Sequence, residues 1–233
     1  AFALAYAKLA LAHDDIYWSI QSSNERLAQV KRAVDRALEL DPDLPEGHVA
    51  LGYYFYHGHR DYDHALEQFA IAAQRQPNNS DIAAAIGFVQ RRQGKWEETL
   101  ASLRKAVDLD PRSYKNAEEL GETNLALGRI REAEQYFARA LSLAPDWGFI
   151  YGYKAWLALA GSGDVERARR MIAEGASRKV STPELNRFLA DAVGEHLTGG
   201  SSTPKALYIT QTGVLPPRFV VFCRAPGRVD SSF

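Results

Sequence analysis

Four prolines divide most of this chain into segments of nearly equal length. They stand at Pro42, Pro77, Pro111 and Pro145, in the stretches "LDPDLPE", "QPNNSD", "LDPRSY" and "LAPDWG", so successive spacings are 35, 34 and 34 residues. A fixed spacing of this length indicates a solenoid, in which each repeated unit buries its apolar face against its neighbours. The period therefore constrains the fold more than any single motif does.

Small and bulky residues recur at fixed places within the segments. One small position holds Ala10, Gly52, Gly87, Gly121 and Ala155, and another holds Ala37, Ala72, Ala106, Ala140 and Gly175. A bulky residue stands three places before the second set, at Val34, Phe69, Leu103, Phe137 and Ile172. Small residues let two helices approach closely, and the bulky residue fills the groove beside the crossing. Each segment is therefore predicted to be two amphipathic helices, helix A and helix B, joined by a short turn.

The predicted unit resembles the tetratricopeptide repeat (TPR). The stretches "AAAIGFVQ…TLASLRKAVDLDP" and "AEELGETN…AEQYFARALSLAP" match that family's pattern without a gap. The resemblance implies an all-α, right-handed superhelix of about five repeats, at about 1–42, 43–77, 78–111, 112–145 and 146–180. In the third repeat, helix A is expected over 80–93 and helix B over 96–109.

Some copies depart from the regular pattern. The first contains "HDDIYWSIQSSN", which predicts a connection between its helices about eight residues longer than the family's turn. The second and fifth have one extra residue, in "HGHRDYD" and "GSGDVER". Residues 181–197 are expected to form a capping helix, because Thr182 suits its N-cap and Pro183 its first turn.

Residues 198–233 form a linker and a tail with a different composition. A Gly/Ser-rich stretch precedes "ALYIT" and "RFVVFC", two β-branched and aromatic runs that predict short strands. The stretch "LYITQTGVLPPRFVVF" resembles part of the C-terminal KH-like domain of the ribosome-assembly GTPase Der. That resemblance implies an RNA- or ribosome-associated factor as an alternative function. A GxxxxGK[ST] loop for GTP is missing from the sequence.

Composition and motifs argue against several other classes of protein. The formal net charge of -1 gives no reason to expect a nucleic-acid partner, and Cys223 is the single cysteine, so the chain cannot form an internal disulfide. No apolar run reaches the length of about 18 residues that spans a bilayer, so no membrane association is expected. The sequence lacks the GxSxG nucleophile motif and the HExxH metal motif. We therefore expect no enzyme and no cofactor, and the oligomeric state stays open.

The stretch "HVALGYYFYHGHRDYDH" contains four of the six histidines. His48 falls at a packing position of helix A, whereas His57, His59 and His64 gather with Asp61 around one predicted turn. Imidazole and carboxylate are ligands that zinc uses, so a metal-binding protein is a second alternative. A structural zinc site needs four ligands held by surrounding hydrogen bonds, and this short turn gives no sign of them. No metal ligand is therefore assigned.

Recognition is the function that a non-catalytic solenoid most readily supplies. In the family, helix A of each repeat lines the concave face, and aromatic residues and arginine dominate interface energies. The residues predicted to line that face are Tyr53, Tyr56, His57, Phe88, Arg91, Arg92, Glu118, Glu122 and Trp156. The alternative is that Tyr53 and Trp156 only pack between repeats and that the arginines are solvated. We predict a scaffold that binds a protein or peptide segment. "LDPDLPEGHVALGYYFYHGHRDYDHALEQFAIA" is also similar to repeats in bacterial signalling proteins, which implies the sensor or adaptor arm of a larger cytoplasmic protein.

Overall fold

A computed structural model describes residues 2–178, 207–208 and 220–221. Its helices belong to two compact units that meet in sequence between Asp110 and Pro111. Unit 1 contains α1 Phe2–Ser19, α2 Asn24–Leu40, α3 Pro45–Tyr53, the π-helical segment η1 Tyr54–His59, α4 Tyr62–Arg75, α5 Ser80–Arg92 and α6 Trp96–Leu109. Unit 2 contains α7 Tyr114–Ala126, α8 Ile130–Leu143, α9 Gly148–Ser162 and α10 Val165–Ser177. The described part of the chain is thus all-α apart from two short strands.

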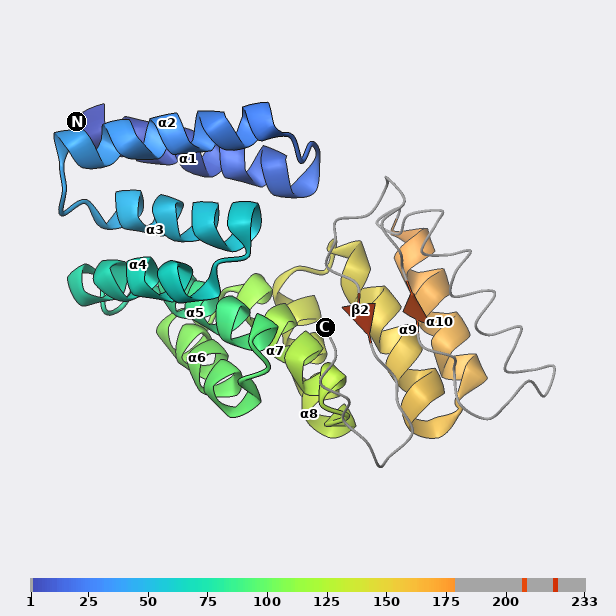
Figure 1. The fold of residues 1–233 in the computed structure, drawn as a ribbon. Coiled ribbons are helices and arrows are strands. Elements are labelled where there is room, and N and C mark those ends of the chain that lie inside the picture. Colours follow the sequence, from blue (N-terminus) through green and yellow to red (C-terminus); the bar gives the residue numbers. More distant parts are fainter. Residues whose placement is uncertain (1, 179–206, 209–219, 222–233) are drawn as a thin grey trace. The chain divides into compact units, whose positions relative to one another are not determined.

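The helices pack as successive pairs, each joined by a short connection (Figure 1). The pairs α1–α2, α3–α4 and α5–α6 follow one another in unit 1, and α7–α8 and α9–α10 form unit 2. Within a unit, each pair also contacts the next, through α1 with α3, α4 with α5, and α8 with α9. This arrangement confirms the predicted all-α repeat fold, and the observed bounds of α5 and α6 lie within one residue of the expected ones.

Local sequence signals fix where the helices begin and end. The side chains of Ser23, Asp61, Asn79, Ser113 and Asp164 accept hydrogen bonds from backbone N–H groups in the first turns of the helices that follow them. Gly94, Gly128 and Gly163 follow helix A of the last three repeats with φ of 72°, 70° and 66°. This left-handed backbone is accessible to glycine without a Cβ clash, so each glycine ends its helix and starts the turn.

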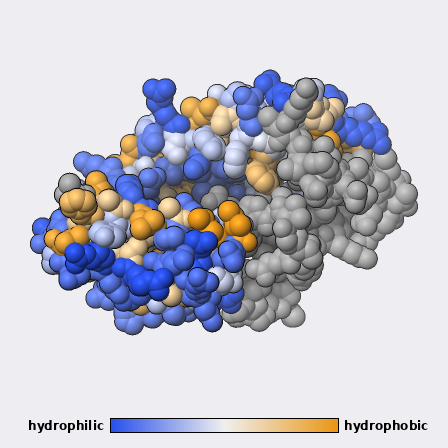
Figure 2. Space-filling view, turned by 90° about the horizontal axis from the view of Figure 1, so that it is seen from above, coloured by the Kyte–Doolittle hydropathy of each residue, from blue (hydrophilic) through white to orange (hydrophobic). Residues whose placement is uncertain are grey.

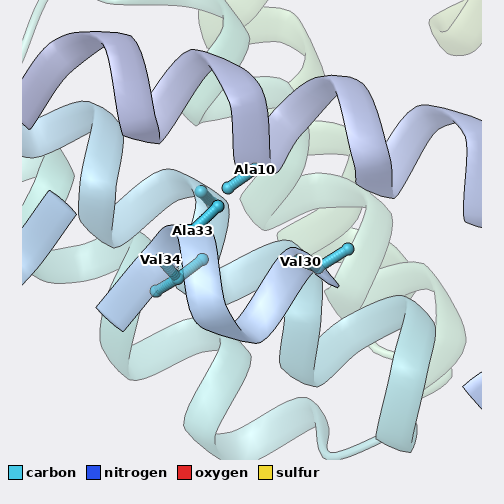
Figure 3. Close-up of a cluster of buried hydrophobic side chains, with 5 residues drawn as sticks. Ala10, Val30, Ala33 and Val34 are labelled. Atoms are coloured by element: carbon cyan, nitrogen blue, oxygen red, sulfur yellow. The ribbon is translucent and has the colours of Figure 1, made fainter. Parts of the chain in front are cut away.

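The recurring small residues lie where the two helices of a pair cross. A Cβ added at Gly52 would approach the Phe69 ring to 2.5 Å, and one at Gly121 would approach the Phe137 ring to 2.8 Å. In the first pair, Ala10 of α1 lies beside Ala33 of α2, with Val30 and Val34 along the same stretch of α2 (Figure 3). The predicted pairing of a small residue with a bulky one is therefore the packing that closes each hairpin.

The insertion in the first repeat lengthens a helix, which corrects the expected long connection. Helix α1 continues to Ser19, and only residues 20–23 join it to α2. The stretch "HDDIYWS" has no glycine or proline to stop a helix, and Asp14 is buried within it. The insertion therefore carries Asp14 and Trp18 along α1 toward the end of helix A in the second repeat.

The extra residue of the second repeat is absorbed by a π-helical turn. Helix α3 passes into η1 over Tyr54–His59, where hydrogen bonds span five residues and so accommodate one more residue per turn. The turn ends at Arg60, whose φ of 54° is the positive value that glycine supplies in later repeats. A non-glycine residue in this region carries backbone strain.

Replacing Arg60 with glycine is expected to stabilise the protein by about 0.5–1 kcal/mol, because the left-handed backbone costs an L-residue about 1–2 kcal/mol and glycine almost nothing. Urea denaturation followed by far-UV circular dichroism would measure the change. Gly128→Ala is the matched control at a left-handed position, and it should lower stability by a similar amount. A loss of stability in Arg60→Gly would show that the Arg60 side chain contributes more than its backbone costs.

Two short strands are described near the C-terminal end of the sequence. Strands β1, Leu207–Tyr208, and β2, Val220–Val221, pair antiparallel, with Leu207 opposite Val221. These strands fall within the two predicted runs. The predicted capping helix over 181–197 lies outside the described residues.

The surface of the described residues carries some apolar side chains. Figure 2 shows apolar residues interspersed with hydrophilic ones on the face that it displays. Exposed large apolar side chains of unit 1 include Phe2, Leu9 and Ile20. Across the described residues, every helix is too short or too polar to cross a bilayer.

Candidate functional site

The candidate site is a cluster of aromatic and arginine side chains in unit 1. It is carried by α1, by the end of helix A in the second repeat, and by α5, which are the first helices of three successive repeats. We call it the aromatic–arginine cluster and define it as Trp18, Tyr53, Tyr56, His57, Phe88, Arg91 and Arg92. Six of these residues were predicted from the sequence, and Trp18 was not.

His57 lies at the centre of the stacked rings. The Trp18 and His57 ring centroids are 4.2 Å apart with an interplanar angle of 16°, and those of Tyr53 and His57 are 5.2 Å apart at 28°. Tyr56 lies 4.6 Å from His57 on the same measure. The π-helical turn places Tyr56 and His57 consecutively on η1, while the lengthened α1 supplies Trp18. The two irregular repeats thus build this part of the cluster together.

A buried carboxylate fixes the orientation of the His57 ring. Asp14 Oδ2 lies 2.7 Å from His57 Nδ1, and the two side chains are 3% and 10% exposed. The other carboxylate oxygen, Oδ1, is buried and has no hydrogen-bond partner among the described residues. Sequence reasoning missed Asp14 because it assigned "HDD" to a connection. The helix-A register could have found it, since Asp14 follows Ala10 by the four residues that separate Tyr56 from Gly52.

Arginine side chains contact the aromatic rings from α5. Arg92 Nε donates to the Tyr56 hydroxyl at 3.3 Å, and the Arg91 guanidinium carbon lies 5.6 Å from the Phe88 ring centroid. Phe88 and Tyr53 both pack against the buried core formed by Phe69, Ala85 and Val89. The cluster is therefore continuous with the core of unit 1, which gives its rings a rigid support.

The environment of Tyr53 favours its neutral form. Burial raises the pKa of the Tyr53 hydroxyl well above its ordinary value, and the negative charge of Asp14 is the second-largest cause. The charges of Asp81 and Asp15 act in the same direction, so acidic groups from α1 and α5 lie around this ring.

Ionisation of Tyr53 should make the stability of the protein depend on pH in the alkaline range. The unfolded tyrosine ionises near pH 10, whereas the folded one keeps its proton, so stability is complete below pH 10 and falls above it. The loss attributable to Tyr53 is at most about 1.4 kcal/mol per pH unit. Tyr53→Phe should lose less stability than wild type between pH 9 and pH 11 in urea titrations. Equal losses in the two proteins would contradict the raised pKa.

His48, His57 and His64 each bond to a different partner. His48 Nδ1 lies 2.9 Å from Gln68 Oε1 and its Nε2 lies 2.9 Å from the Pro42 carbonyl, as expected for a packing residue. His64 Nδ1 lies 2.7 Å from Asp61 Oδ2 beside the N-cap of α4, whereas His57 is bonded to Asp14. Over the described part of the chain, no group of three or more histidine, cysteine or acidic residues is placed to hold a metal ion.

Glu118 and Glu122, the predicted acidic residues of unit 2, bond α7 to the N-cap of α9 and to α9 itself. Trp147 Nε1 donates to both oxygens of Glu118, at 2.9 and 3.0 Å, and the Tyr153 hydroxyl donates to Glu122 at 2.5 Å. Glu118 is buried and Trp156 is only 7% exposed. In this unit, Glu118 and Glu122 bond neighbouring repeats together, and their contact with a partner stays a prediction.

Two family models match separate parts of the chain. A tetratricopeptide repeat family model matches residues 90–157, and the model for the KH-domain-like C-terminal part of EngA bacterial GTPases matches residues 179–233. The second match begins at residue 179, just before the predicted end of the repeat array at residue 180, and it covers the predicted capping helix over 181–197. It is therefore longer than the stretch that carried the resemblance in the sequence.

Individual proteins agree with both matches. The GTPase Der of Thermomicrobium roseum is 39% identical over 71 residues, which cover 30% of this chain and 15% of the GTPase. The solved structure of PilW, a type IV pilus biogenesis factor, superposes with a TM-score of 0.70 at 19% identity, covering 87% of this chain and 89% of PilW. YrrB, a TPR protein with an unusual peptide-binding site, gives 0.57 at 19% identity, covering 81% and 92%. These structural likenesses show the fold.

The chain covers only a small part of several curated relatives. The chain spans between 15% and 20% of the length of three curated relatives that it matches, the peroxisomal targeting signal receptor of Eremothecium gossypii among them. The repeat pattern, the helix pairs and the two family matches nevertheless agree with one another. The chain is a tetratricopeptide repeat protein whose residues 179–233 match the KH-like C-terminal domain of the EngA GTPases.

Proposed function

We propose that this chain is a non-enzymatic scaffold that binds a peptide or protein segment, and that the aromatic–arginine cluster is its principal contact surface. The observation that carries the proposal is the grouping of Trp18, His57 and Arg92 side chains from three successive repeats. Half-buried aromatic rings and arginines are the residues that most often dominate interface energies. The peptide-binding site of the structurally similar YrrB supports the same class of function.

The chemistry of the cluster suits an extended segment with apolar and acidic side chains. Tyr53 and Phe88 offer ring surface on a rigid core, and Arg91 and Arg92 offer guanidinium donors to a carboxylate. Glu118, Glu122 and Trp156 are proposed as further contacts on unit 2. We also propose that the chain acts as a sensor or adaptor arm of a larger cytoplasmic bacterial protein.

Selection from a random peptide library displayed on phage, with the full chain immobilised, tests this function. Peptides that bind wild type are expected to bind Arg91→Ala/Arg92→Ala at least tenfold more weakly, a loss of about 1.4 kcal/mol or more. Arg36→Ala/Arg75→Ala is the matched control, because both arginines are exposed on second helices of their repeats. Binding that survives the first pair of substitutions, or falls equally with the second, would refute the assignment.

A second candidate function rests on the C-terminal match. KH domains bind single-stranded RNA, and the β1–β2 pair lies within the matched residues 179–233. If the tail binds RNA, deleting residues 198–233 should abolish retention of a labelled single-stranded RNA on filters while leaving peptide binding intact. Unchanged retention after the deletion would remove this candidate.

A further inference from the structure

The chemistry around Asp14 suggests which side chain a bound segment contributes, an inference that rests on the proposed peptide-binding function. Asp14 is 2% exposed, which is unusual for an aspartate, and His57 satisfies only one of its oxygens. A buried carboxylate oxygen without a donor is unfavourable, because it has lost its hydration and gained no hydrogen bond. A ligand that brings an N–H group to this oxygen would restore that bond.

The surroundings of Asp14 favour a positively charged ligand. Asp15 of α1 and Asp81 of α5 are near enough to Tyr53 for their charges, with that of Asp14, to raise its pKa. The faces of Trp18, Tyr53 and Tyr56 carry the negative end of the aromatic quadrupole, which attracts cations. Arg92 is bonded to the Tyr56 hydroxyl, and even with that arginine present no described residue donates a hydrogen bond to Asp14 Oδ1.

The stacking geometry favours a planar cation over a compact one. His57, a flat ring bonded to Asp14, already lies between Trp18 and Tyr53, with interplanar angles of 16° and 28°. A guanidinium group is also flat, stacks on aromatic rings, and donates several N–H groups to a carboxylate. An ammonium group has no face with which to stack. Trp18 stands one residue before the end of α1 and is half-buried, so one side of the stack faces solvent.

We propose that Asp14, with Trp18, Tyr53 and His57, forms a subsite for an arginine side chain of the bound peptide. The arginine would donate to Asp14 Oδ1 and stack among the rings, while Arg91 and Arg92 on α5 contact an acidic group elsewhere on the same peptide. The preferred partner is therefore a segment that carries both charges, with arginine as the residue that determines specificity.

The peptides selected on the full chain provide the test. They should share an arginine at one position, and replacing it by citrulline, which keeps the shape and removes the charge, should weaken binding to wild type at least tenfold. Asp14→Asn keeps the size of the side chain and an acceptor for His57, and it should reduce the arginine-to-citrulline ratio to about threefold or less. Asp35→Asn, at an exposed carboxylate paired with Lys31 on α2, is the control and should leave the ratio unchanged.

The outcomes separate this inference from the proposed function. Selected peptides that need Arg91 and Arg92 but bind equally with citrulline would overturn the arginine subsite and leave the scaffold function standing. A citrulline effect that persists in full in Asp14→Asn would overturn the role of Asp14. If Asp14→Asn does not fold, Asp81→Asn at an exposed site on α5 should lower the same ratio by about two- to threefold; no change in the ratio would count against the subsite.

Discussion

Phe69→Ala is expected to destabilise the protein by about 3–5 kcal/mol. The Phe69 side chain is fully buried and packs against the backbone of Gly52 where the two helices of the second repeat cross. The glycine has no side chain that could move into the space, so truncation leaves a cavity as well as removing apolar contacts. Urea denaturation followed by circular dichroism at 222 nm measures the loss of free energy of unfolding.

Two companion substitutions make this test specific to the helix crossing. Leu40→Ala removes an apolar side chain that is 43% exposed at the end of α2, and it should cost less than about 1 kcal/mol. Gly52→Ala places a Cβ within 2.5 Å of the Phe69 ring and should also destabilise the protein, whereas Gly52→Ala combined with Phe69→Leu should recover part of the loss. A small effect of Phe69→Ala would mean that the second repeat does not close through this contact.

His57→Phe is expected to destabilise the protein by about 3 kcal/mol. The ring stays flat and apolar enough to stack between Trp18 and Tyr53, but it cannot donate to Asp14. The carboxylate is then buried without any hydrogen-bond donor, and breaking a buried pair from one side costs about 3–5 kcal/mol. The measurement is again the free energy of unfolding in urea.

A double substitution distinguishes the broken pair from poor packing. Asp14→Leu/His57→Phe removes both polar partners at similar volume, and it should restore most of the stability that His57→Phe loses. If the double variant is as unstable as the sum of the two single variants, the residues do not interact. If His57→Phe alone costs less than about 1 kcal/mol, the Asp14 carboxylate is solvated in solution.

The regular part of the fold could be predicted because the sequence repeats its packing rule. Gly87 and Leu103 in the third repeat stand in the same relation as Gly52 and Phe69 in the second, so one helix pair defines the others. Turn glycines such as Gly94 mark the end of helix A in the same way. Within these repeats, periodicity alone placed α5 and α6 to within one residue.

The irregular repeats could not be predicted in the same way. An insertion can lengthen a helix, form a loop or widen one turn, and local propensity did not distinguish these outcomes for "HDDIYWS" or "HGHRDYD". Tertiary packing decided between them, because α1 extends to reach η1 and the Asp14–His57 bond joins the two insertions. Trp18, which belongs to the candidate site, and Asp14, which is bonded to His57 of that site, were missed for that reason.

Hydrogen–deuterium exchange of the full chain, with and without a selected peptide, tests the central claim most directly. If the aromatic–arginine cluster binds the peptide, backbone amides near the C-terminal ends of α1 and α5 and throughout η1 should exchange more slowly in the complex. Amides of α2, α4 and α6, the second helices of the same repeats, should exchange at unchanged rates. Protection confined to α2, α4 and α6, or to residues 179–233, would contradict the claim.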